Sequence, residues 1–395
     1  MTYYQLPSIN CNLTQANIKV KFTDQENISV YINNSLYKYL KIAKGKITNY
    51  PEEWRQKKKY TNPYEFIHTN IPSTCMSISK MTPLSRAFFK MVEIARIFNI
   101  FGGITNMRSF HLAEGPGGFI EAFVYLRRNP HDNYYGMTLI DQENNSIPGW
   151  KKSELFLKSN QNVTIEYCKD GRGDLYNYEN LIYCQEKYKN SMDVITGDGG
   201  FDFSINYDQQ EGMALKLILS QIAYAITMQK KGGIFILKVF DLFLKPSVQL
   251  IYLLSCCYEE VYVIKPHTSR IANSERYIVC KKFKLECSLE LSNKFISILK
   301  VLKSMPNKIN SLLNIHIQSY YLNNLVEINA ILGQQQIENI ITTILYIEND
   351  NKAEQLKFLK NKNIQRCLHW CKKYDIPYNK NIYSTNIFLN EINNH

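Results

Sequence analysis

Two lysines and two acids in this sequence lie at positions that packing alone does not explain. Lys238 interrupts an otherwise apolar, strand-like run, and Asp198 follows another such run. A charge on a buried strand is costly unless it is paired, so Asp198 is a natural partner for Lys238, in either a catalytic or a purely structural pair. Lys90 lies on an apolar helical stripe and Glu275 precedes a short apolar run. Each of these two, taken alone, also fits a surface charge.

Together, the four side chains could orient a weak nucleophile such as a hydroxyl and remove its proton. A lysine serves as a base only when its pKa falls well below about 10.4. Desolvation of Lys238 and the second cation, Lys90, lower that pKa, whereas Asp198 and Glu275 raise it. The sequence leaves this balance open. We therefore predict that Lys238 is either the base or the group that steers the hydroxyl.

A glycine-rich turn follows a short apolar run and precedes a helical pattern. The turn is Gly115-Pro116-Gly117-Gly118, so the order is strand, tight turn and helix. Glycines let backbone N–H groups approach a ligand closely, and a helix N-terminus adds a favourable dipole. Turns of this kind also serve as packing corners. This one lacks the third glycine of the dinucleotide fingerprint, and no P-loop motif follows it.

The scaffold that positions these residues is predicted by strand-like runs that alternate with helical stripes. Such alternation is typical of a parallel sheet with helices on both faces. In these sheets ligands bind beyond the carboxyl ends of the strands. The glycine turn, Asp198 and Asp174, which lies in an acidic loop after another strand-like run, all fall at such ends. The sequence therefore predicts an α/β fold with a ligand site at one edge of its sheet.

The composition favours a polyanionic partner. The 395 residues carry a formal net charge of +12, and the sequence pI is near 9.0. Nucleic acid is the first candidate and an anionic membrane surface the second, although a proteome rich in Asn, Lys and Ile produces the same charge. Basic and aromatic residues are interleaved in residues 53–66, a pattern that suits RNA and equally a solvated basic face.

Signals for other protein classes are weak. The N-terminal residues show no leader pattern, and no apolar run is long enough to span a bilayer. Ten cysteines in a large chain without a leader predict a reduced, intracellular protein. Cys367, His369 and Cys371 offer soft metal ligands, but the cysteines have helical spacing, and we predict no metal site.

Six motifs resemble, in order, those of the FtsJ-like ribose 2′-O-methyltransferases. The resemblance is closest to the branch of eukaryotes and large DNA viruses that methylates mRNA caps. The motifs are Ser85-Arg-Ala-Phe-Phe-Lys90, His111-Leu-Ala-Glu-Gly-Pro-Gly-Gly-Phe, Gly136-Met-Thr-Leu, Asp193-Val-Ile-Thr-Gly-Asp198-Gly-Gly-Phe, Phe235-Ile-Leu-Lys238-Val-Phe-Asp-Leu-Phe, and Lys265-Pro-His-Thr-Ser-Arg270-Ile-Ala-Asn273-Ser-Glu275-Arg-Tyr-Ile-Val-Cys.

The resemblance implies a role for each matching residue. Lys90, Asp198, Lys238 and Glu275 would be the catalytic tetrad. S-adenosylmethionine (SAM) would contact Glu114, Gly115, Pro116, Gly117, Gly118 and Asp198, with Asp174 on its adenine side. Arg86, Arg270 and Asn273 would contact the RNA or its cap. The chain departs from the family at His111, where an acid is common, so Glu114 is expected to take over that role. Asp141 is the only nearby candidate for the ribose-binding acid.

These expectations define one fold and one domain division. We predict a Rossmann-like SAM-dependent methyltransferase fold with a mostly parallel seven-stranded sheet and helices on both faces. Residues 76–285 would form the FtsJ-like domain, residues 1–75 an N-terminal extension with RNA or cap contacts, and residues 286–395 a helical C-terminal domain.

The expected activity is methyl transfer from SAM to the ribose 2′-OH of the first transcribed nucleotide of capped mRNA. The expected partners are the capped mRNA 5′ end and other capping or transcription proteins, with no membrane. The expected location is the cytoplasm, a viral factory or virion, or the nucleus. The alternatives are a 2′-O-methyltransferase for rRNA, tRNA or the second cap nucleotide, and a catalytically silent RNA-binding capping subunit. The glycine turn and the strand lysine disfavour a dehydrogenase.

Overall fold

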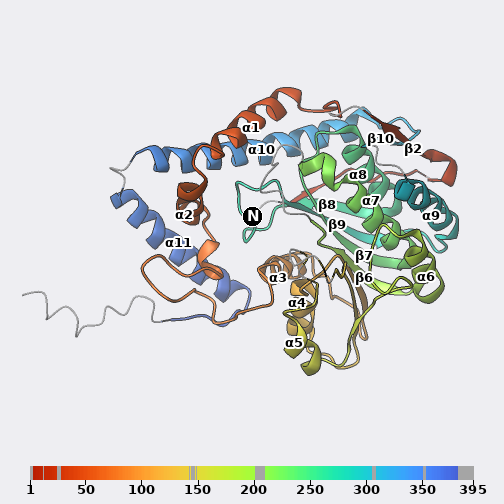
Figure 1. The fold of residues 1–395 in the computed structure, drawn as a ribbon, viewed down its shortest axis with the longest axis horizontal. Helices are drawn as coiled ribbons and strands as arrows, with labels where there is room; N and C mark the ends of the chain where they lie inside the picture. Colours follow the sequence, from red (N-terminus) through yellow and green to blue (C-terminus); the bar gives the residue numbers. More distant parts are fainter. Residues whose placement is uncertain are drawn as a thin grey trace, which may run out of the picture.

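An eight-stranded sheet forms the centre of the protein (Figure 1). The structure, a computed structural model, describes residues 3–11, 13–24, 28–141, 143, 147, 149–200, 210–304, 308–349 and 353–380. The strand order is β1-β8-β9-β7-β6-β3-β4-β5. The strands are β1 (Tyr3–Gln5), β3 (Arg108–Leu112), β4 (Asn133–Met137), β5 (Val163–Ile165), β6 (Met192–Gly197), β7 (Gln229–Val239), β8 (Tyr258–Ile264) and β9 (Arg276–Phe283).

Parallel pairing joins β5, β4, β3, β6 and β7, as the alternation of strand and helix predicts. Strand β9 runs antiparallel to both β7 and β8. The predicted Rossmann-like fold is therefore confirmed. The sheet has one strand more than the seven predicted, because β1 pairs antiparallel with β8, with Tyr3 opposite Ile264. A strand of three residues is too short for its alternation to stand out in a sequence.

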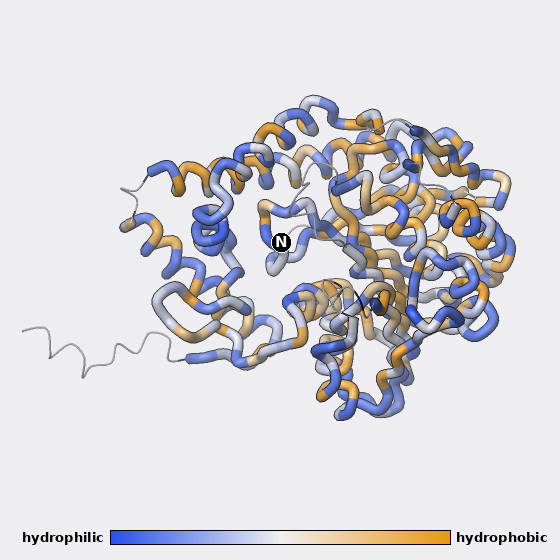
Figure 2. The backbone as a smooth tube through the Cα atoms, viewed as in Figure 1, coloured by the Kyte–Doolittle hydropathy of each residue, from blue (hydrophilic) through white to orange (hydrophobic). Residues whose placement is uncertain are grey.

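Helices cover both faces of the sheet, and each face has its own buried cluster (Figure 1). The first cluster includes α6 (Tyr178–Tyr188), α7 (Gln210–Met228), α8 (Lys245–Cys257) and α9 (Leu289–Ser304). The second includes α3 (Ala87–Ile97), α4 (Gly118–Arg127), residues of α5 (Glu154–Ser159) and α11 (Ala353–Lys373). Figure 2 shows the apolar residues concentrated where these helices meet the sheet.

Strand β7 divides its side chains between the two clusters. Phe235 and Leu237 lie in the first cluster, whereas Ile234 and Ile236 lie in the second. Successive side chains of a strand point to opposite faces, so Lys238 continues the second set. Lys238 is thereby directed to the face that α3 covers.

Segments from the two ends of the chain pack together beside the sheet (Figure 1). Helix α10 (Ser319–Glu348) packs along α1 (Asn34–Ile47) and α2 (Pro51–Thr61), and α11 packs on α2 and on the short helical turn Glu65–Ile67. Strand β2 (Ile18–Thr23) pairs antiparallel with β10 (Lys308–Leu313). The division at residues 75 and 285 stays a prediction, since the two end segments share a small core that includes Trp54 and Ile340.

Candidate active site

The four predicted charged residues meet at the edge of the sheet where β6 and β7 end. Asp198 directly follows β6, Lys238 is the last residue but one of β7, and Glu275 directly precedes β9. Lys90 comes from α3 on the covering face. Because β9 is antiparallel to β7, the start of β9 lies beside the end of β7, and Lys238 pairs in register with Tyr277. The strand directions therefore bring three separate sequence motifs to one place.

Two buried ion pairs form this centre. The Lys90 Nζ atom lies 2.7 Å from the Glu275 carboxylate. The Lys238 Nζ atom lies 3.2 Å from Asp198 Oδ1 and donates a hydrogen bond of 2.7 Å to the Asp198 carbonyl oxygen. The four side chains are between 8% and 16% exposed. The sequence analysis grouped these four residues as a functional set, and in the structure each lysine contacts one carboxylate of the set.

Tyr277 links the two ion pairs, and the sequence analysis did not identify it. Its hydroxyl donates to Asp198 Oδ1 over 3.0 Å and lies 3.4 Å from Lys90 Nζ. The signal was present in the sequence, because residues two apart on a strand point to the same side, and Tyr277 is two residues after Glu275. Burial, then Asp198 and Glu275, raise the pKa of Tyr277, so it stays a hydrogen-bond donor.

The two lysines differ in the direction of their pKa shifts. At Lys90, burial lowers the pKa, and the attraction of Glu275 and Asp198 offsets this only in part. At Lys238, burial also lowers the pKa, but Asp198 and Glu275 outweigh it and the net shift is upward. Burial raises the pKa of Glu275, whereas Lys90 and Lys238 hold it far below its usual range. The balance that the sequence left open thus favours the charged form of Lys238.

The glycine turn between β3 and α4 leaves no room for side chains. A Cβ atom on Gly115 would lie 2.5 Å from the carbonyl oxygen of Gly149, and one on Gly118 would overlap the hydroxyl of Ser85. Gly117 has φ +106°, in the region that favours glycine. The turn therefore needs glycine at three positions, for close packing and for backbone conformation.

Glu114 directly precedes this turn, and its side chain binds the first N–H groups of the helix that follows, α4. Its Oε1 atom accepts the N–H groups of Phe119 at 2.6 Å and Ile120 at 3.3 Å. Its Oε2 atom is buried and has no hydrogen-bond partner among the residues that the structure describes. Burial, together with Asp198, raises the pKa of Glu114 well above its usual value. A buried acceptor without a partner is costly, so this atom fits a ligand contact.

His111 is not a substitute for the expected acid. Its ring nitrogens lie 2.8 Å from the hydroxyl oxygens of Ser109 and Thr196, on its own strand and on β6. Burial lowers the pKa of His111 to about 3, so the ring is neutral. Both nitrogens are occupied within the sheet, which leaves Glu114 as the acid of this turn.

The acidic loop after β5 lies against the end of β4. A Cβ atom on Gly173 would lie 2.5 Å from the carbonyl oxygen of Thr138, just after β4. Asp174 Oδ1 accepts the N–H of Tyr176 at 2.9 Å. Asp141 lies 3.9 Å from the Arg172 guanidinium. Both acids are thus at the carboxyl edge of the sheet, and their contacts to a ligand stay predictions.

The loop from residue 265 to residue 275 carries two of the three predicted substrate residues, Arg270 and Asn273, and the third, Arg86, is the N-cap of α3. Arg270 forms a two-point contact with Glu65 of the N-terminal segment, with Nε 2.9 Å from Oε2. Arg86 donates to the Thr268 carbonyl oxygen over 3.0 Å. Lys265 Nζ donates to the carbonyl oxygens of Asn273 at 2.5 Å and Glu275 at 2.9 Å. Arg86 and Arg270 therefore hold the loop to two other parts of the chain.

Glu93 is a second residue that the sequence analysis missed. It lies one turn after Lys90 on α3 and is fully buried. Its carboxylate accepts the N–H groups of His267 at 2.8 Å and Thr268 at 3.2 Å, and the Thr268 hydroxyl at 3.1 Å. Burial raises the pKa of Glu93 to about 7. Its only signal in the sequence was helical spacing after Lys90.

The comparison with known families settles which family carries this arrangement. The FtsJ-like methyltransferase family matches residues 83–283, which include both ion pairs, the glycine turn and the loop before β9. The chain belongs to this family.

Within the FtsJ-like family, several relatives have names that state a substrate. The human "Cap-specific mRNA (nucleoside-2'-O-)-methyltransferase 1" is 33% identical over 260 residues, which is 59% of this chain and 29% of the human protein. The Xenopus laevis protein of the same name is 33% identical over 257 residues, with 59% and 28% coverage. This chain thus spans less than a third of the length of these relatives.

The matches also include a relative that is named inactive and a solved structure. An "Inactive cap-specific mRNA (nucleoside-2'-O-)-methyltransferase 1B" of Caenorhabditis briggsae is 29% identical over 199 residues, covering 49% of this chain and 23% of that protein. A solved structure of a putative ribosomal RNA methyltransferase from Plasmodium falciparum has 20% identity and a TM-score of 0.37, covering 51% of this chain and 98% of that chain.

The remaining expectations concern metals and membranes. Cys367 and Cys371 are buried in α11 as free thiols, and in the described part of the chain no group of three or more His, Cys, Asp or Glu residues is arranged to hold a metal ion. In the same part, no helix combines the length and hydropathy of a membrane span.

Proposed function

We propose that this chain is a SAM-dependent mRNA cap (nucleoside-2′-O-)-methyltransferase, acting on the first transcribed nucleotide. The observation that carries the proposal is the buried centre in which Lys90 pairs with Glu275 and Lys238 with Asp198. This centre lies at the same edge of the sheet as the glycine turn. The names of the relatives supply the substrate class.

SAM is the methyl donor in this proposal, and the residues of the turn fit it. Gly115 and Gly117 keep the backbone of the turn free of side chains. The buried Glu114 Oε2 atom, without a partner in the described chain, would form a hydrogen bond with a polar group of the ligand. Asp174 would lie on the adenine side. The bound donor supplies an electrophilic methyl group, and the protein has to align the hydroxyl with it.

Lys238 would steer the attacking hydroxyl. Its raised pKa keeps it protonated in the unliganded protein, so it enters the reaction as a hydrogen-bond donor. A fixed ammonium group beside the 2′-oxygen orients that oxygen and stabilises the negative charge that develops on it. The raised pKa thus favours the steering role over the base role of Lys238, and the proton of the hydroxyl would leave to water once the methyl group has been transferred. Asp198, fixed by Tyr277, holds the ammonium group in place.

Capped RNA suits the charge of the chain, and Arg86, Arg270 and Asn273 would contact it. A guanidinium group binds phosphate in a two-point geometry. Arg270 already forms such a geometry with the Glu65 carboxylate, so an RNA phosphate would either displace Glu65 from the guanidinium or bind beside it. The proposal includes an intracellular location, wherever capped transcripts are made.

A silent RNA-binding subunit is the second candidate, since one matched relative is named inactive. The presence of both lysines and both acids in the buried centre argues against a silent subunit. A subunit without catalysis has no need for two buried lysines, each within 3.2 Å of a carboxylate, because buried ion pairs contribute little net stability.

The test supplies the protein with SAM labelled in the methyl group and with matched RNAs that are cap-0, uncapped or already 2′-O-methylated. We expect label only on the first nucleotide of cap-0 RNA. Equal labelling of uncapped RNA would move the function to another 2′-O-methylation target, and no labelling would favour the silent subunit. A Lys238→Ala variant that still binds SAM and RNA should lose transfer. Near-normal transfer by that variant would contradict the assigned role.

A further inference from the structure

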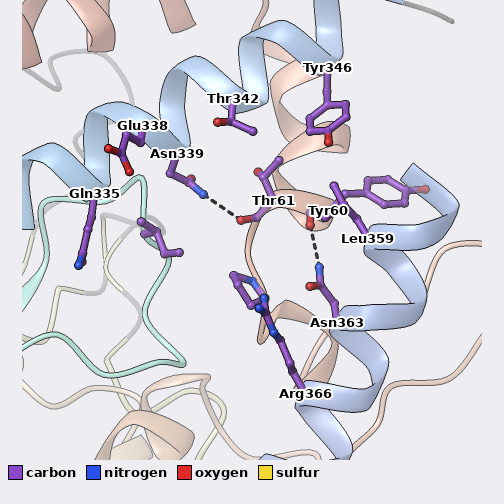
Figure 3. A pocket seen from close by; sticks show the side chains of 12 residues that line it. Tyr60, Thr61, Gln335, Glu338, Asn339, Thr342, Tyr346, Leu359, Asn363 and Arg366 are labelled. Atoms are coloured by element: carbon purple, nitrogen blue, oxygen red, sulfur yellow. Dashed lines mark hydrogen bonds between the residues drawn. The ribbon is translucent and has the colours of Figure 1, made fainter. Parts of the chain in front are cut away.

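A cavity of about 330 Å³ lies where the N-terminal segment meets the two C-terminal helices (Figure 3). Its walls come from the end of α2, from the loop before β9, and from α10 and α11. The lining residues used below are Tyr60, Asn339, Thr342, Tyr346, Asn363 and Arg366. Its volume is within the range of small-ligand sites.

Two asparagines fix the walls of this cavity. Asn339 of α10 donates to the carbonyl oxygen of Thr61 over 2.8 Å, and Asn363 of α11 donates to that of Tyr60 over 2.7 Å (Figure 3). The end of α2 is therefore held from both sides by side-chain amides. The site is built from segments almost 300 residues apart in sequence, and its shape does not depend on one mobile loop.

The chemistry of the lining suits an unstacked nucleobase. Amide groups of Asn339 and Asn363, the Thr342 hydroxyl and the rings of Tyr60 and Tyr346 contribute donors, acceptors and aromatic surface. A base presents both donors and acceptors on its edge and an aromatic face for contact. The lining carries one acid, Glu338, and one base, Arg366, and the guanidinium suits the phosphate of a nucleotide.

A row of cations runs from α2, the helix that contributes Tyr60 to the cavity, toward the catalytic centre. Lys58 of α2 is close enough to Arg270 and Arg86 for both to lower its pKa, after burial as the first cause. Arg86 in turn lies close enough to Lys90 to lower the pKa of that lysine. Glu65 is the carboxylate paired with this row, through Arg270. One acid among three cations leaves an excess of positive charge along the path.

We propose that the cavity holds a base of the substrate RNA downstream of the methylated nucleotide, with the RNA backbone along Lys58, Arg270 and Arg86. The inference rests on the proposed function, because it takes capped RNA as the strand. The cap guanine is the competing occupant, since its methylated ring is cationic and the lining holds an acid, Glu338, as well as Arg366. The cationic row favours a base of the transcript, because the strand that follows the methylated nucleotide carries the phosphates that such a row binds.

The test measures binding by fluorescence anisotropy, without methyl donor, for a labelled capped dinucleotide and for labelled capped and uncapped RNAs of about twelve nucleotides. Arg366→Ala removes the positive charge of the lining, which also includes Glu338, and Thr342→Trp fills the cavity. Lys362→Ala on α11 and Leu345→Trp on α10 are matched controls, because they change exposed residues of the same helices outside the lining. We expect both cavity variants to weaken the binding of the long RNAs about 10-fold, and the controls to change it little.

The dinucleotide should bind equally well to all variants. Three outcomes overturn the inference: equal losses for Arg366→Ala and Lys362→Ala, unchanged binding of long RNA to Thr342→Trp, or the same loss for the dinucleotide, which would assign the cavity to the cap guanine. The experiments distinguish failure of the methyltransferase proposal from failure of the proposal that the cavity holds an RNA base. Absence of methyl transfer by the unmodified chain would leave this binding result intact, and unaltered RNA binding by the cavity variants would leave the transferase assignment intact.

Discussion

Lys90 and Glu275 form a buried ion pair whose energetic role can be measured apart from catalysis. Their side chains are 8% and 13% exposed, and their charged groups lie 2.7 Å apart. Lys90→Met would leave the Glu275 carboxylate buried without its main partner. Removing one partner of a buried pair typically costs about 3 to 5 kcal/mol of unfolding free energy. We expect about 3 kcal/mol, since the Ser269 hydroxyl still donates to Glu275 over 2.8 Å.

The double variant Lys90→Met, Glu275→Gln should recover most of this loss. It removes both charges and leaves side chains of similar size, so no unpaired charge stays buried. The expected coupling between the two sites is about 2 kcal/mol. The surface pair Lys158–Glu154 is a matched control, with a similar distance of 2.6 Å but side chains 70% and 74% exposed. Its coupling should be about 0.5 kcal/mol or less.

Urea unfolding followed by circular dichroism gives these free energies, and labelled methyl transfer gives activity for the same proteins. Stability should return in the double variant while activity does not. If Lys90→Met costs less than about 1 kcal/mol, the pair is effectively solvated and the reasoning from burial fails. If the stable double variant transfers methyl groups normally, the pair is structural only. Because the pKa of Glu275 is held low, its contribution should be present above the ordinary glutamate value of 4.5 and lost as the pH falls below it.

Three further predictions test other parts of the site. Gly115→Ala should abolish SAM binding in calorimetric titration, because its Cβ would lie 2.5 Å from the Gly149 oxygen, whereas Gly45→Ala, with nothing within 4 Å, should bind SAM normally. Tyr277→Phe should lower kcat about 10-fold with little change in KM, since it removes one hydrogen bond to the Asp198 carboxylate. An unchanged kcat would show that Tyr277 has no part in catalysis. His111→Gln should flatten the acid side of the stability profile. In the unmodified chain the folded-state pKa of His111 is lowered to about 3, so its contribution to the free energy of unfolding is present above pH 6.5. This contribution falls by about 2 kcal/mol between pH 6.5 and 5. Equal acid sensitivity of the variant and the unmodified chain would contradict this.

The residues at strand ends were predictable because parallel strands place their carboxyl ends at one edge. Asp198 and Lys238 could therefore be joined from the sequence alone. Lys90 and Glu275 could not be joined that way, since their contact depends on how α3 crosses the sheet and on the antiparallel entry of β9. Their residue types and positions marked both as candidates, and the family resemblance assigned them to the catalytic tetrad. The sign of the Lys238 pKa shift was also beyond the sequence, because it depends on distances to two carboxylates.

The contacts between the two ends of the chain were beyond sequence patterns for a different reason. Helix α10 has apolar residues whose spacing predicts a helix, but the spacing does not name the partner. Its partners, α1 and α2, lie almost 300 residues earlier, and the close approach occurs at Gly333, where a Cβ atom would lie 2.8 Å from the Leu36 side chain. The cavity at Asn339 and Asn363 exists only because of this pairing.

One face of α3, together with its N-cap residue Arg86, ties the loop before β9 to the buried ion pairs. Arg86, Lys90 and Glu93 are spaced four and three residues apart, so they lie on one face of the helix. Arg86 and Glu93 hold the loop at Thr268, and Lys90 holds its end at Glu275. The pKa of Glu93 is raised to about 7, so the charge on the group that holds this loop changes near neutral pH. Helix α3 therefore fixes the loop that carries Arg270 and Asn273, the predicted RNA contacts, relative to the two buried ion pairs.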